Sequence, residues 1–359
     1  MSAFHLSGPV IVSTLTILDE VWVDSGVLRL SPSPSVDYQD IHGWVVPGLV
    51  DVHCHVGLDS GGAVEPQLAH KQAQIDRDAG TLLIRDAGSP LDTSFLNGVA
   101  SAPRLIRAAR FIARPKRYLR GYAREIEVAD LPRVIVEEAR KGDGWVKLIA
   151  DWIDRDLGDL TPLWPADVLA EAIAAAHAEG AKVTAHTFST EAIDPLLDAG
   201  IDCIEHGTGM TVDQMERAAA AGVPVVPTLL QVANFESFAA LGEAKFPRYA
   251  QRMRAMYARR YEHVAAMHRA GVQLLVGTDA GGSIGHGSLP LECAELVKAG
   301  IPAADVLAAA SWAAREFLGV PGIEDGASAD VVVYANDPRE DITALQRPTA
   351  VILRGERVA

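Results

Sequence analysis

Cysteine is scarce in this chain, which holds only three, Cys54, Cys203 and Cys293. No two of them form a C-x-x-C pair, and three thiols cannot all pair with one another, so the spacing argues against a disulfide framework. Free thiols are typical of a reducing compartment. We therefore expect three unpaired cysteines and a cytoplasmic protein.

Long apolar runs and excess positive charge are also missing. No segment reaches the roughly 18 consecutive apolar residues that a membrane-spanning helix needs, and residues 1–18 lack the basic start of a signal peptide. The formal net charge of −15 argues against nucleic acid or an anionic membrane as a partner, since both require a basic surface. The expected partner is a small-molecule substrate, and homo-oligomerisation stays open.

Motifs of several common enzyme classes are absent as well. The chain has no G-x-x-x-x-G-K-S/T phosphate loop, no G-x-G-x-x-G after a strand, no H-E-x-x-H helix and no G-x-S-x-G nucleophile elbow. No cofactor other than metal is indicated.

What is present is a regular alternation of short apolar runs with amphipathic segments. Helix-like stretches such as 166–179, 213–221 and 248–270 recur along the chain between or beside predicted strands. The strands are predicted to end near His55, Arg85, Arg107, Ile149, His186, His206, Thr228 and Thr278. Eight strand–helix units predict an α/β fold with a closed (β/α)8 TIM-like barrel.

The segments outside this barrel are rich in predicted strands. We expect residues 1–46 and 326–359 to pair into one small β-sandwich-like domain built from both termini, and residues 47–325 to form the barrel. This pairing would bring the two chain ends together.

Six potential metal ligands stand at or just after predicted strand ends, the face where barrel enzymes place their chemistry. They are His53, His55, Lys147, His186, His206 and Asp279. Alternate residues of a strand face the same side, so His53 and His55 can face one cavity while Cys54 points away. Taken singly, each histidine also fits a hydrogen-bonded core residue, and Asp279 also fits a helix N-cap. The ordered set favours a binuclear metal centre.

Lys147 is the most discriminating of the six. The chain has seven lysines against 25 arginines, yet Lys147 stands in the Trp-Val-Lys-Leu-Ile run of residues 145–149, which is predicted to be a buried strand. A buried ammonium is costly without a partner, whereas a neutral buried amine can react with carbon dioxide to give a carbamate. This anion can bridge two metals. Pairing of Lys147 with Asp86 or Asp151 is the alternative.

With these residues in place, the chain resembles the amidohydrolase superfamily, in particular its imidazolonepropionase-like and metal-dependent prolidase-like branch. The likeness runs nearly end to end. Its motifs are Pro47-Gly48-Leu49-Val50-Asp51-Val52-His53-Cys54-His55, Arg85-Asp86-Ala87-Gly88, Lys147, Thr184-Ala185-His186, Ile204-Glu205-His206-Gly207-Thr208, Val226-Pro227-Thr228-Leu229, Gly277-Thr278-Asp279-Ala280, Gly326-Ala327-Ser328-Ala329-Asp330 and Asn336-Asp337-Pro338.

The resemblance implies a distorted (β/α)8 barrel in which a metal-activated hydroxide attacks an amide, ester or related acyl bond. It implies two divalent ions, expected to be Zn²⁺ because histidine and carboxylate ligands suit zinc. The implied ligands are His53, His55 and Asp279 for the more buried metal, His186 and His206 for the more exposed one, and N6-carboxylysine at Lys147 as the bridge. Asp279 would also be the catalytic residue that moves the proton from the water to the leaving group.

One segment departs from the family pattern. After strand three, where many relatives carry a Gly-Gly-His-Gly-like stretch, residues 113–122 read Ala-Arg-Pro-Lys-Arg-Tyr-Leu-Arg-Gly-Tyr. In an acidic chain this basic stretch predicts capture of an acidic substrate group, because arginine binds carboxylates with two parallel hydrogen bonds. The candidate substrate-binding residues are Arg117, Tyr118, Arg120 and, past strand eight, His286. A surface segment whose charges meet acidic neighbours is the alternative, and for His286 an exposed loop histidine.

Together these features predict a metal-dependent hydrolase that cleaves an amide-type C–N bond in an N-acyl amino acid, a dipeptide or a cyclic amide. Fold and metals do not fix the scissile bond, so a lactonase, a phosphotriesterase or a deaminase on the same scaffold is the nearer alternative. A catalytically silent barrel that serves as a binding module is the more distant one. The complete ligand set argues against it.

Overall fold

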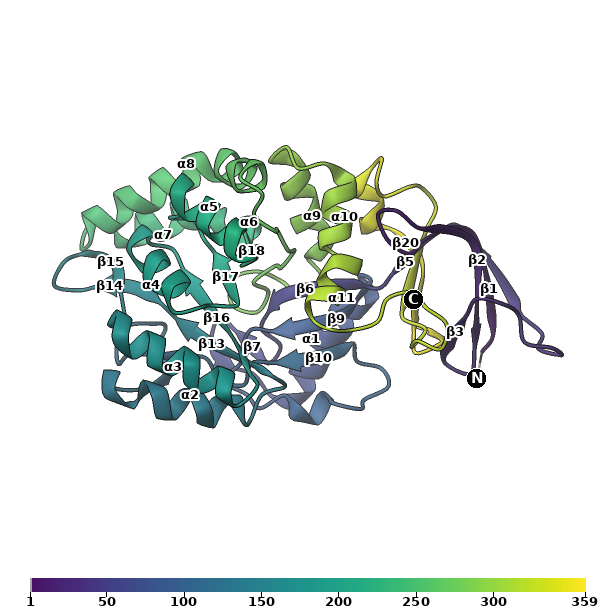
Figure 1. Cartoon of the computed structure of the whole chain (residues 1–359), viewed down its shortest axis with the longest axis horizontal. Coiled ribbons are helices and arrows are strands. Elements are labelled where there is room, and N and C mark those ends of the chain that lie inside the picture. Colours follow the sequence, from purple (N-terminus) through teal and green to yellow (C-terminus); the bar gives the residue numbers. More distant parts are fainter. Residues whose placement is uncertain (1) are drawn as a thin grey trace.

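The computed structural model describes residues 2–359, so Met1, which begins the segment considered for a signal peptide, lies outside the described residues. Figure 1 shows an α/β body with the strands from both chain ends gathered at one end of the molecule. Among residues 2–359, no helix combines the length and the apolar character needed to cross a membrane.

The strands from both chain ends form one eight-stranded sheet, in which β5 and β19 pair antiparallel with Val45 opposite Val333. Its strands are β1 (Phe4–Ile11), β2 (Ile17–Asp24), β3 (Val27–Arg29), β4 (Gln39–His42), β5 (Trp44–Pro47), β19 (Val331–Tyr334), β20 (Pro348–Leu353) and β21 (Glu356–Arg357). We expected a sandwich-like arrangement, but these strands belong to a single sheet. An irregularity in β1 between Ser7 and Val10 lets this strand pair with β4 and then with β5.

The α/β body contains two parallel sheets whose strands follow the predicted order. The first sheet has the order β10-β9-β6, and the second has the order β12-β11-β13-β16-β17-β18. Their strands are β6 (Leu49–Cys54), β9 (Thr81–Asp86), β10 (Arg104–Arg107), β11 (Ile112–Ala113), β12 (Arg124–Glu125), β13 (Trp145–Ile149), β16 (Lys182–Thr187), β17 (Cys203–His206) and β18 (Val225–Val226). In register, Ile149 lies opposite His186, and Thr187 lies opposite His206. Neighbouring strands therefore end close together.

The predicted eighth strand is irregular and connects the two sheets. Residues 272–280 form only isolated bridges, at Leu274 with β18 and at Ala280 with β6. Backbone hydrogen bonds run from the Leu275 amide to the Val225 carbonyl at 3.0 Å and from the Val52 amide to the Val276 carbonyl at 2.9 Å. A Cβ atom at Gly277 would lie 2.6 Å from the His53 Cβ, so only glycine allows this close approach.

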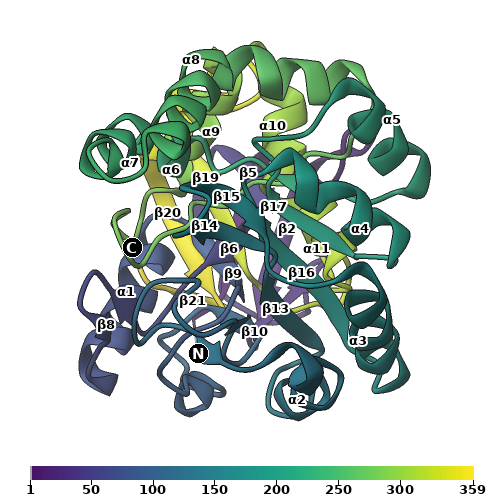
Figure 2. The ribbon, with the colours of Figure 1, turned by 90° about the vertical axis from the view of Figure 1, so that its left-hand side faces the viewer.

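Helices surround the strands of the body (Figures 1 and 2). They are α1 (Pro66–Asp78), α2 (Leu131–Ala139), α3 (Ala166–Ala178), α4 (Ile193–Asp198), α5 (Val212–Ala221), α6 (Leu229–Val232), α7 (Phe235–Gly242), α8 (Pro247–Arg269), α9 (Leu289–Lys298), α10 (Ala303–Ala309) and α11 (Trp312–Phe317). The three predicted helices match α3, α5 and α8 within one residue at each end. Gly222 ends α5 with a left-handed φ of 67°, the conformation expected of a C-cap glycine.

Short elements complete the chain. Two hairpins, β7 (Leu58–Asp59) with β8 (Gly62–Ala63) and β14 (Asp151–Asp154) with β15 (Asp159–Pro162), extend beyond the strands that precede them. The 3-10 helices are η1 (Ser94–Leu96), η2 (Val128–Asp130), η3 (Thr190–Ala192) and η4 (Ile342–Gln346). The main core packs the apolar faces of α2, α3 and α4 against residues such as Leu148, Val183 and Ile204 of the parallel sheet. This packing fixes the strand ends that carry the predicted site.

Candidate metal centre and its cavity

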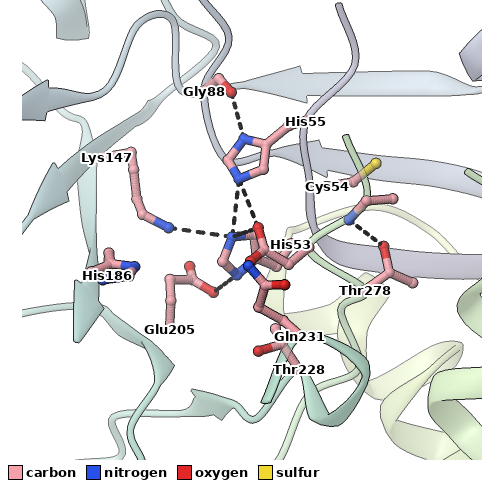
Figure 3. Close-up of polar contacts among 12 residues, drawn as sticks. His53, Cys54, His55, Gly88, Lys147, His186, Glu205, Thr228, Gln231 and Thr278 are labelled. Atoms are coloured by element: carbon pink, nitrogen blue, oxygen red, sulfur yellow. Dashed lines mark hydrogen bonds and ion pairs between the residues drawn. The ribbon is translucent and has the colours of Figure 1, made fainter. Parts of the chain in front are cut away.

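The six predicted ligands come together near the carboxyl ends of the parallel strands. They are His53 on β6, His55 one residue beyond it, Lys147 on β13, His186 on β16, His206 at the end of β17, and Asp279 in the irregular eighth segment. Figure 3 labels four of them, His53, His55, Lys147 and His186. Ligand atoms of His53, His206 and Asp279 all lie within 4.8 Å of one another.

Three polar side-chain atoms converge where His53, His55 and Asp279 meet. The Nδ1 atom of His55 lies 2.6 Å from the Gly88 carbonyl oxygen, and the Nδ1 atom of His53 lies 2.7 Å from the Glu205 Oε2 atom. The Nδ1 atom of His55 therefore donates to this carbonyl, which leaves its Nε2 atom as a lone-pair acceptor. The Nδ1 atom of His53 faces the Glu205 carboxylate, and its Nε2 atom faces that of His55.

These two Nε2 atoms lie 3.2 Å apart, and the Asp279 Oδ1 atom lies 3.1 Å from that of His53 and 3.0 Å from that of His55. A cation among these three atoms would stabilise the close approach of the two rings and the carboxylate. The donor set of two imidazoles and one carboxylate fits a divalent metal such as zinc.

A second donor pair is formed by His186 and His206. The His186 Nδ1 atom lies 3.1 Å from the His206 Nε2 atom, and the other nitrogen of His206 contacts the Thr228 hydroxyl at 2.7 Å. The His186 Nε2 atom has no hydrogen-bond partner among the described residues, and it lies 3.8 Å from the Asp151 Oδ1 atom. The pair can present two nitrogens to a second cation.

Asp151 is held behind His186 by hydrogen bonds from the Phe188 and Ser189 amides at 2.9 and 2.7 Å. Burial raises the pKa of Asp151 to about 6, because these hydrogen bonds only partly offset the lost hydration. Asp151 therefore places a carboxylate behind the His186 ring, 3.8 Å from its Nε2 atom.

Lys147 lies between the two donor groups. Its side chain is 2% exposed, and the Nζ atom lies 3.4 Å from the His53 Nε2 atom. Burial lowers the pKa of the Lys147 amine from its ordinary value, which favours the neutral, nucleophilic form. Asp86 and Asp151, the alternative partners, form no ion pair with Lys147 within residues 2–359.

Two functional residues at the centre were not predicted as site residues, namely Glu205 and Arg85. The Glu205 Oε2 atom contacts His53, whereas its Oε1 atom accepts hydrogen bonds from Arg85 and the Thr184 hydroxyl. Arg85 is fully buried, and its Nε atom donates to the Val52 carbonyl at 2.6 Å. The signal in the sequence was an arginine and a glutamate inside otherwise apolar strands, where an isolated charge is costly.

Three backbone positions around the centre adopt left-handed conformations. The φ values are 65° at His206, 48° at Thr228 and 58° at Asp279. Glu205 and His206 are adjacent, and strict alternation would send their side chains to opposite faces. The left-handed turn at His206 lets both of them face the centre. Such strain is typical of functional sites.

The electrostatic balance of the centre favours the metal-binding forms of Asp279, His55 and His206. At His53, burial lowers the pKa, but the Glu205 and Asp279 carboxylates outweigh this effect and raise it. Burial raises the pKa of Asp279, but His53, His55 and His206 outweigh this effect and hold the pKa well below its ordinary value. Burial lowers the pKa of His206 to about 3 and lowers that of His55 as well. In the neutral range, Asp279 is therefore anionic, and these two histidines are neutral.

The centre opens into a cavity of about 450 Å³, and His55, His186 and Asp279 form part of its wall. Aromatic residues make up 6% of the chain, yet eight of them line this cavity. Phe111 directly precedes β11, Tyr118 and Tyr122 lie between β11 and β12, and Trp152 lies on β14. Phe188 directly follows β16, Phe238 lies on α7, Phe246 directly precedes α8, and Tyr249 lies on α8.

Of the four predicted substrate-binding residues, only Tyr118 lines the cavity. Its ring packs edge-on against Trp152, with ring centroids 4.7 Å apart, and lies 5.7 Å from the His186 ring. Arg120 is exposed and lies outside the cavity wall. The prediction that Arg120 binds substrate is not supported by this placement and stays a prediction.

Arg117 is bound to the β14–β15 hairpin. Its guanidinium donates to the Asp154 carboxylate at 3.2 Å, to the Thr161 hydroxyl at 2.6 Å and to the Trp152 carbonyl at 3.1 Å. These contacts favour the alternative that the loop cations meet neighbouring acceptors. His286 lies behind β6, where its Nδ1 atom is 2.8 Å from the Asp76 Oδ2 atom and 3.8 Å from the Cys54 Sγ atom. Its side chain is only 6% exposed, so the exposed-loop alternative for His286 is wrong.

Comparisons with known proteins agree with this architecture. A model of the amidohydrolase family matches residues 138–358. A protein of Mycobacterium tuberculosis, named only as uncharacterized, is 50% identical over 337 residues, which are 94% of this chain and 91% of that protein.

Two solved structures share the fold at low sequence identity. A Xaa-Pro dipeptidase with methionine bound in its active site has a TM-score of 0.83 at 21% identity, over 99% of each chain. The ochratoxinase of A. niger has a TM-score of 0.81 at 18% identity, over 99% of this chain and 95% of that one. With the family match over more than half of its length, the chain belongs to the amidohydrolase family and is a hydrolase.

Proposed function

We propose that this protein is a binuclear metal-dependent hydrolase that cleaves an amide-type C–N bond. The observation that carries the proposal is the convergence of the His53 and His55 Nε2 atoms on the Asp279 carboxylate, three atoms within 3.2 Å of one another. The Gly88 carbonyl fixes the tautomer of the His55 ring, as is typical of metal ligands, and the Glu205 carboxylate faces the Nδ1 atom of His53.

In this proposal, His53, His55 and Asp279 hold the more buried metal, and His186 and His206 hold the more exposed one. Lys147 lies beside His53, and its lowered pKa supports its conversion to N6-carboxylysine, which bridges the two sites. Imidazole and carboxylate ligands support zinc as the native ion.

Two metals held by these residues would lower the pKa of a bound water to about 7 and would polarise the carbonyl of the substrate. The chain's own residues perform the other tasks. Asp279 is anionic in the neutral range, so its carboxylate would accept the proton of the attacking water and return it to the leaving nitrogen. Tyr118 lines the cavity next to His186 and orients the substrate, and the aromatic wall excludes bulk water.

The similarity to structures named as a Xaa-Pro dipeptidase and an ochratoxinase supports a hydrolase of this general type. A lactonase, a phosphotriesterase and a deaminase on the same scaffold are the alternatives, because fold and ligands do not select the scissile bond. The domain limits at residues 46/47 and 325/326, the cytoplasmic location and homo-oligomerisation stay predictions.

The decisive experiment combines elemental analysis of the purified protein with an activity panel. We expect two zinc equivalents per chain and hydrolysis of neutral anilides, with activity lost on chelation and restored by added zinc. If the protein hydrolyses only lactones or only phosphotriesters, the proposed amide cleavage is wrong and the corresponding alternative is supported. A protein that holds no metal and turns over no substrate would support the binding-module alternative instead.

A further inference from the structure

The cavity beside the metal centre carries no basic side chain. Among the described residues, neither lysine nor arginine lines it, and its ionisable groups, other than tyrosine, are His55, His186 and Asp279. All three belong to the centre itself. The wall that remains for the rest of the substrate is apolar or uncharged.

A free carboxylate on the part of the substrate that extends away from the centre would therefore lose its hydration without gaining a cationic partner. Moving an anionic group into such surroundings costs several kcal/mol unless a charge or several hydrogen bonds compensate it. Arg117, which precedes the cavity residue Tyr118 in the sequence, donates hydrogen bonds to Asp154, Thr161 and Trp152. It does not line the cavity.

The shape and composition of the cavity suit a large apolar group. Its volume of about 450 Å³ lies within the range of roughly 300–1,000 Å³ that is typical of sites for drug-sized ligands. The walls are rings in mutual contact, with Tyr118 edge-on to Trp152 at 4.7 Å and Phe188 edge-on to His186 at 4.2 Å. Such walls favour flat rings, which pack against them edge-on or offset.

The cavity mouth is apolar as well. Leu119 and Leu241 belong to the wall, yet they are 46% and 86% exposed. Exposed leucines next to an apolar cavity extend the apolar surface that a large substrate can bury. Each Å² of apolar area buried contributes about 25 cal/mol to the binding free energy.

One uncharged group in the wall is oriented by a small network, namely the Gln231 amide. Its Oε1 atom accepts hydrogen bonds from the Ser283 hydroxyl at 2.9 Å and from the Asn234 side-chain amide at 3.2 Å. The Nε2 atom is therefore the donor that remains free. Figure 3 shows the Gln231 side chain extending toward His53. A neutral carbonyl oxygen is the natural acceptor for this donor.

We propose that the substrate is a neutral molecule with a bulky aromatic group, which fills the ring-lined cavity while the Gln231 amide donates a hydrogen bond to an uncharged oxygen. This inference rests on the proposed hydrolase function for the position of the scissile bond. It differs from the sequence prediction of an acidic substrate, because the cavity wall lacks a cation.

The test compares three anilides of one leaving group on the zinc-loaded protein, namely the p-nitroanilides of acetic acid, 2-naphthoic acid and 6-sulfo-2-naphthoic acid. We expect the neutral naphthoyl compound to have the highest kcat/KM, on the order of 100-fold above the sulfonated compound, as desolvation of an unpaired anion requires. Equal or higher kcat/KM for the sulfonated compound overturns the proposal, as does a preference for the acetyl compound.

A rim variant tests whether the missing cation sets this preference. Leu241→Arg adds a cation at the mouth and should raise kcat/KM for the sulfonated compound relative to the neutral one by at least about tenfold. Leu157→Arg, at a position that is 59% exposed but outside the cavity wall, is the matched control and should leave the ratio unchanged. An unchanged ratio in Leu241→Arg overturns the role assigned to the uncharged wall.

Binding separates this inference from the proposed function. Calorimetric titration of the zinc-loaded protein with 2-naphthamide and with 6-sulfo-2-naphthamide measures the preference without turnover. Tighter binding of the neutral amide supports the inference even if no anilide is hydrolysed, in which case amide cleavage alone fails. Equal or tighter binding of the sulfonated amide overturns the inference even if anilides are hydrolysed.

Discussion

The Nδ1 atom of His53 lies 2.7 Å from the Oε2 atom of Glu205, and neither side chain is more than 1% exposed. Arg85, which is equally buried, contacts the other carboxylate oxygen of Glu205. Burial raises the pKa of Glu205, but Arg85 and His53 outweigh this effect and hold the pKa well below its ordinary value. The anionic Glu205 carboxylate therefore lies on the Nδ1 side of the His53 ring, and the Nε2 atom of this ring faces the candidate metal centre.

Glu205→Gln should weaken both the fold and the centre. The amide cannot balance the Arg85 charge, and breaking a buried ion pair typically costs about 3–5 kcal/mol of unfolding free energy. Loss of the support behind His53 should also lower metal affinity by about 10–100-fold. Urea unfolding in chelator and a competitive zinc titration measure the two effects.

The matched control is Glu191→Gln, which breaks a pair with Arg252 in which Glu191 is 50% exposed. Its cost should stay below about 1 kcal/mol, because exposed pairs contribute little. Equal losses in the two variants would contradict the role of the Glu205 carboxylate.

Lys147→Ala should remove the bridge between the two metals. We expect loss of most activity and of about one metal equivalent per chain, with partial recovery of both in the presence of short carboxylic acids that occupy the bridge position. Lys182→Ala, at an exposed position on β16, is the control and should keep both metals. Two bound metals beside an unmodified Lys147 in a crystal structure would contradict the proposed bridge.

Asp279→Asn should keep the fold and remove the proton acceptor. Loss of a group that transfers a proton typically lowers the rate by about 10²–10⁴-fold, and the effect should appear in kcat. Zinc content and the unfolding midpoint, measured on the same sample, separate this effect from loss of the ligand. A kcat close to that of the unaltered protein would mean that the proton is accepted elsewhere.

The order of the strands and the convergence of the six predicted ligands could be predicted from the sequence. Apolar runs mark the strands, and a polar residue at the end of such a run, as at His186 or His206, is visible without a structure. The side chains meet because parallel strands place their carboxyl ends at one edge. Local pattern and topology therefore agree for this part of the molecule.

Other features depend on contacts between distant segments. The pairing of Arg85 with Glu205 joins residues 120 positions apart, and no local pattern links them. The irregular eighth segment follows from the close approach of Gly277 to His53. The basic loop was read as an anion site because its charge is visible in the sequence, whereas the hairpin that engages Arg117 is not.

Stability should fall as the pH rises from about 5 to 8, in part through Glu292. Burial raises the pKa of Glu292 to about 8, although the Leu230 and Leu229 amides, 2.8 and 2.6 Å away, partly offset this effect. The folded state therefore holds its proton above the ordinary value of 4.5. The stabilisation is complete below the ordinary pKa, and it is lost at roughly 1.4 kcal/mol per pH unit until the folded pKa is reached.

The measurement is the unfolding free energy from urea titrations across this pH range, taken as the difference between the unaltered protein and Glu292→Gln. Glutamine mimics the protonated acid, so the variant should show the flatter profile. Glu171→Gln, at an exposed position on α3, is the control and should leave the slope unchanged. Parallel profiles for the unaltered protein and Glu292→Gln would assign the pH dependence to other buried acids.

Arg117→Ala discriminates between the two interpretations of the basic loop. If Arg117 captures an acidic substrate group, its loss should lower kcat/KM for anionic substrates relative to neutral ones by about 10-fold or more. The hairpin contacts predict a different result, because Arg117 is 13% exposed and donates to Asp154 and Thr161. Its loss then leaves these acceptors unpaired, lowers the unfolding free energy by about 1–3 kcal/mol and leaves the substrate ratio unchanged.

Arg120→Ala completes the comparison, since Arg120 is exposed and shares the loop without hairpin contacts among the described residues. On the hairpin interpretation, this variant should match the unaltered protein in both stability and substrate ratio. Pairs of neutral and anionic naphthoyl anilides, together with urea unfolding, provide the two readouts for both variants. If Arg117→Ala changes the ratio of kcat/KM between anionic and neutral substrates and leaves stability unchanged, the loop binds substrate. This result would contradict the uncharged cavity as the sole determinant of specificity.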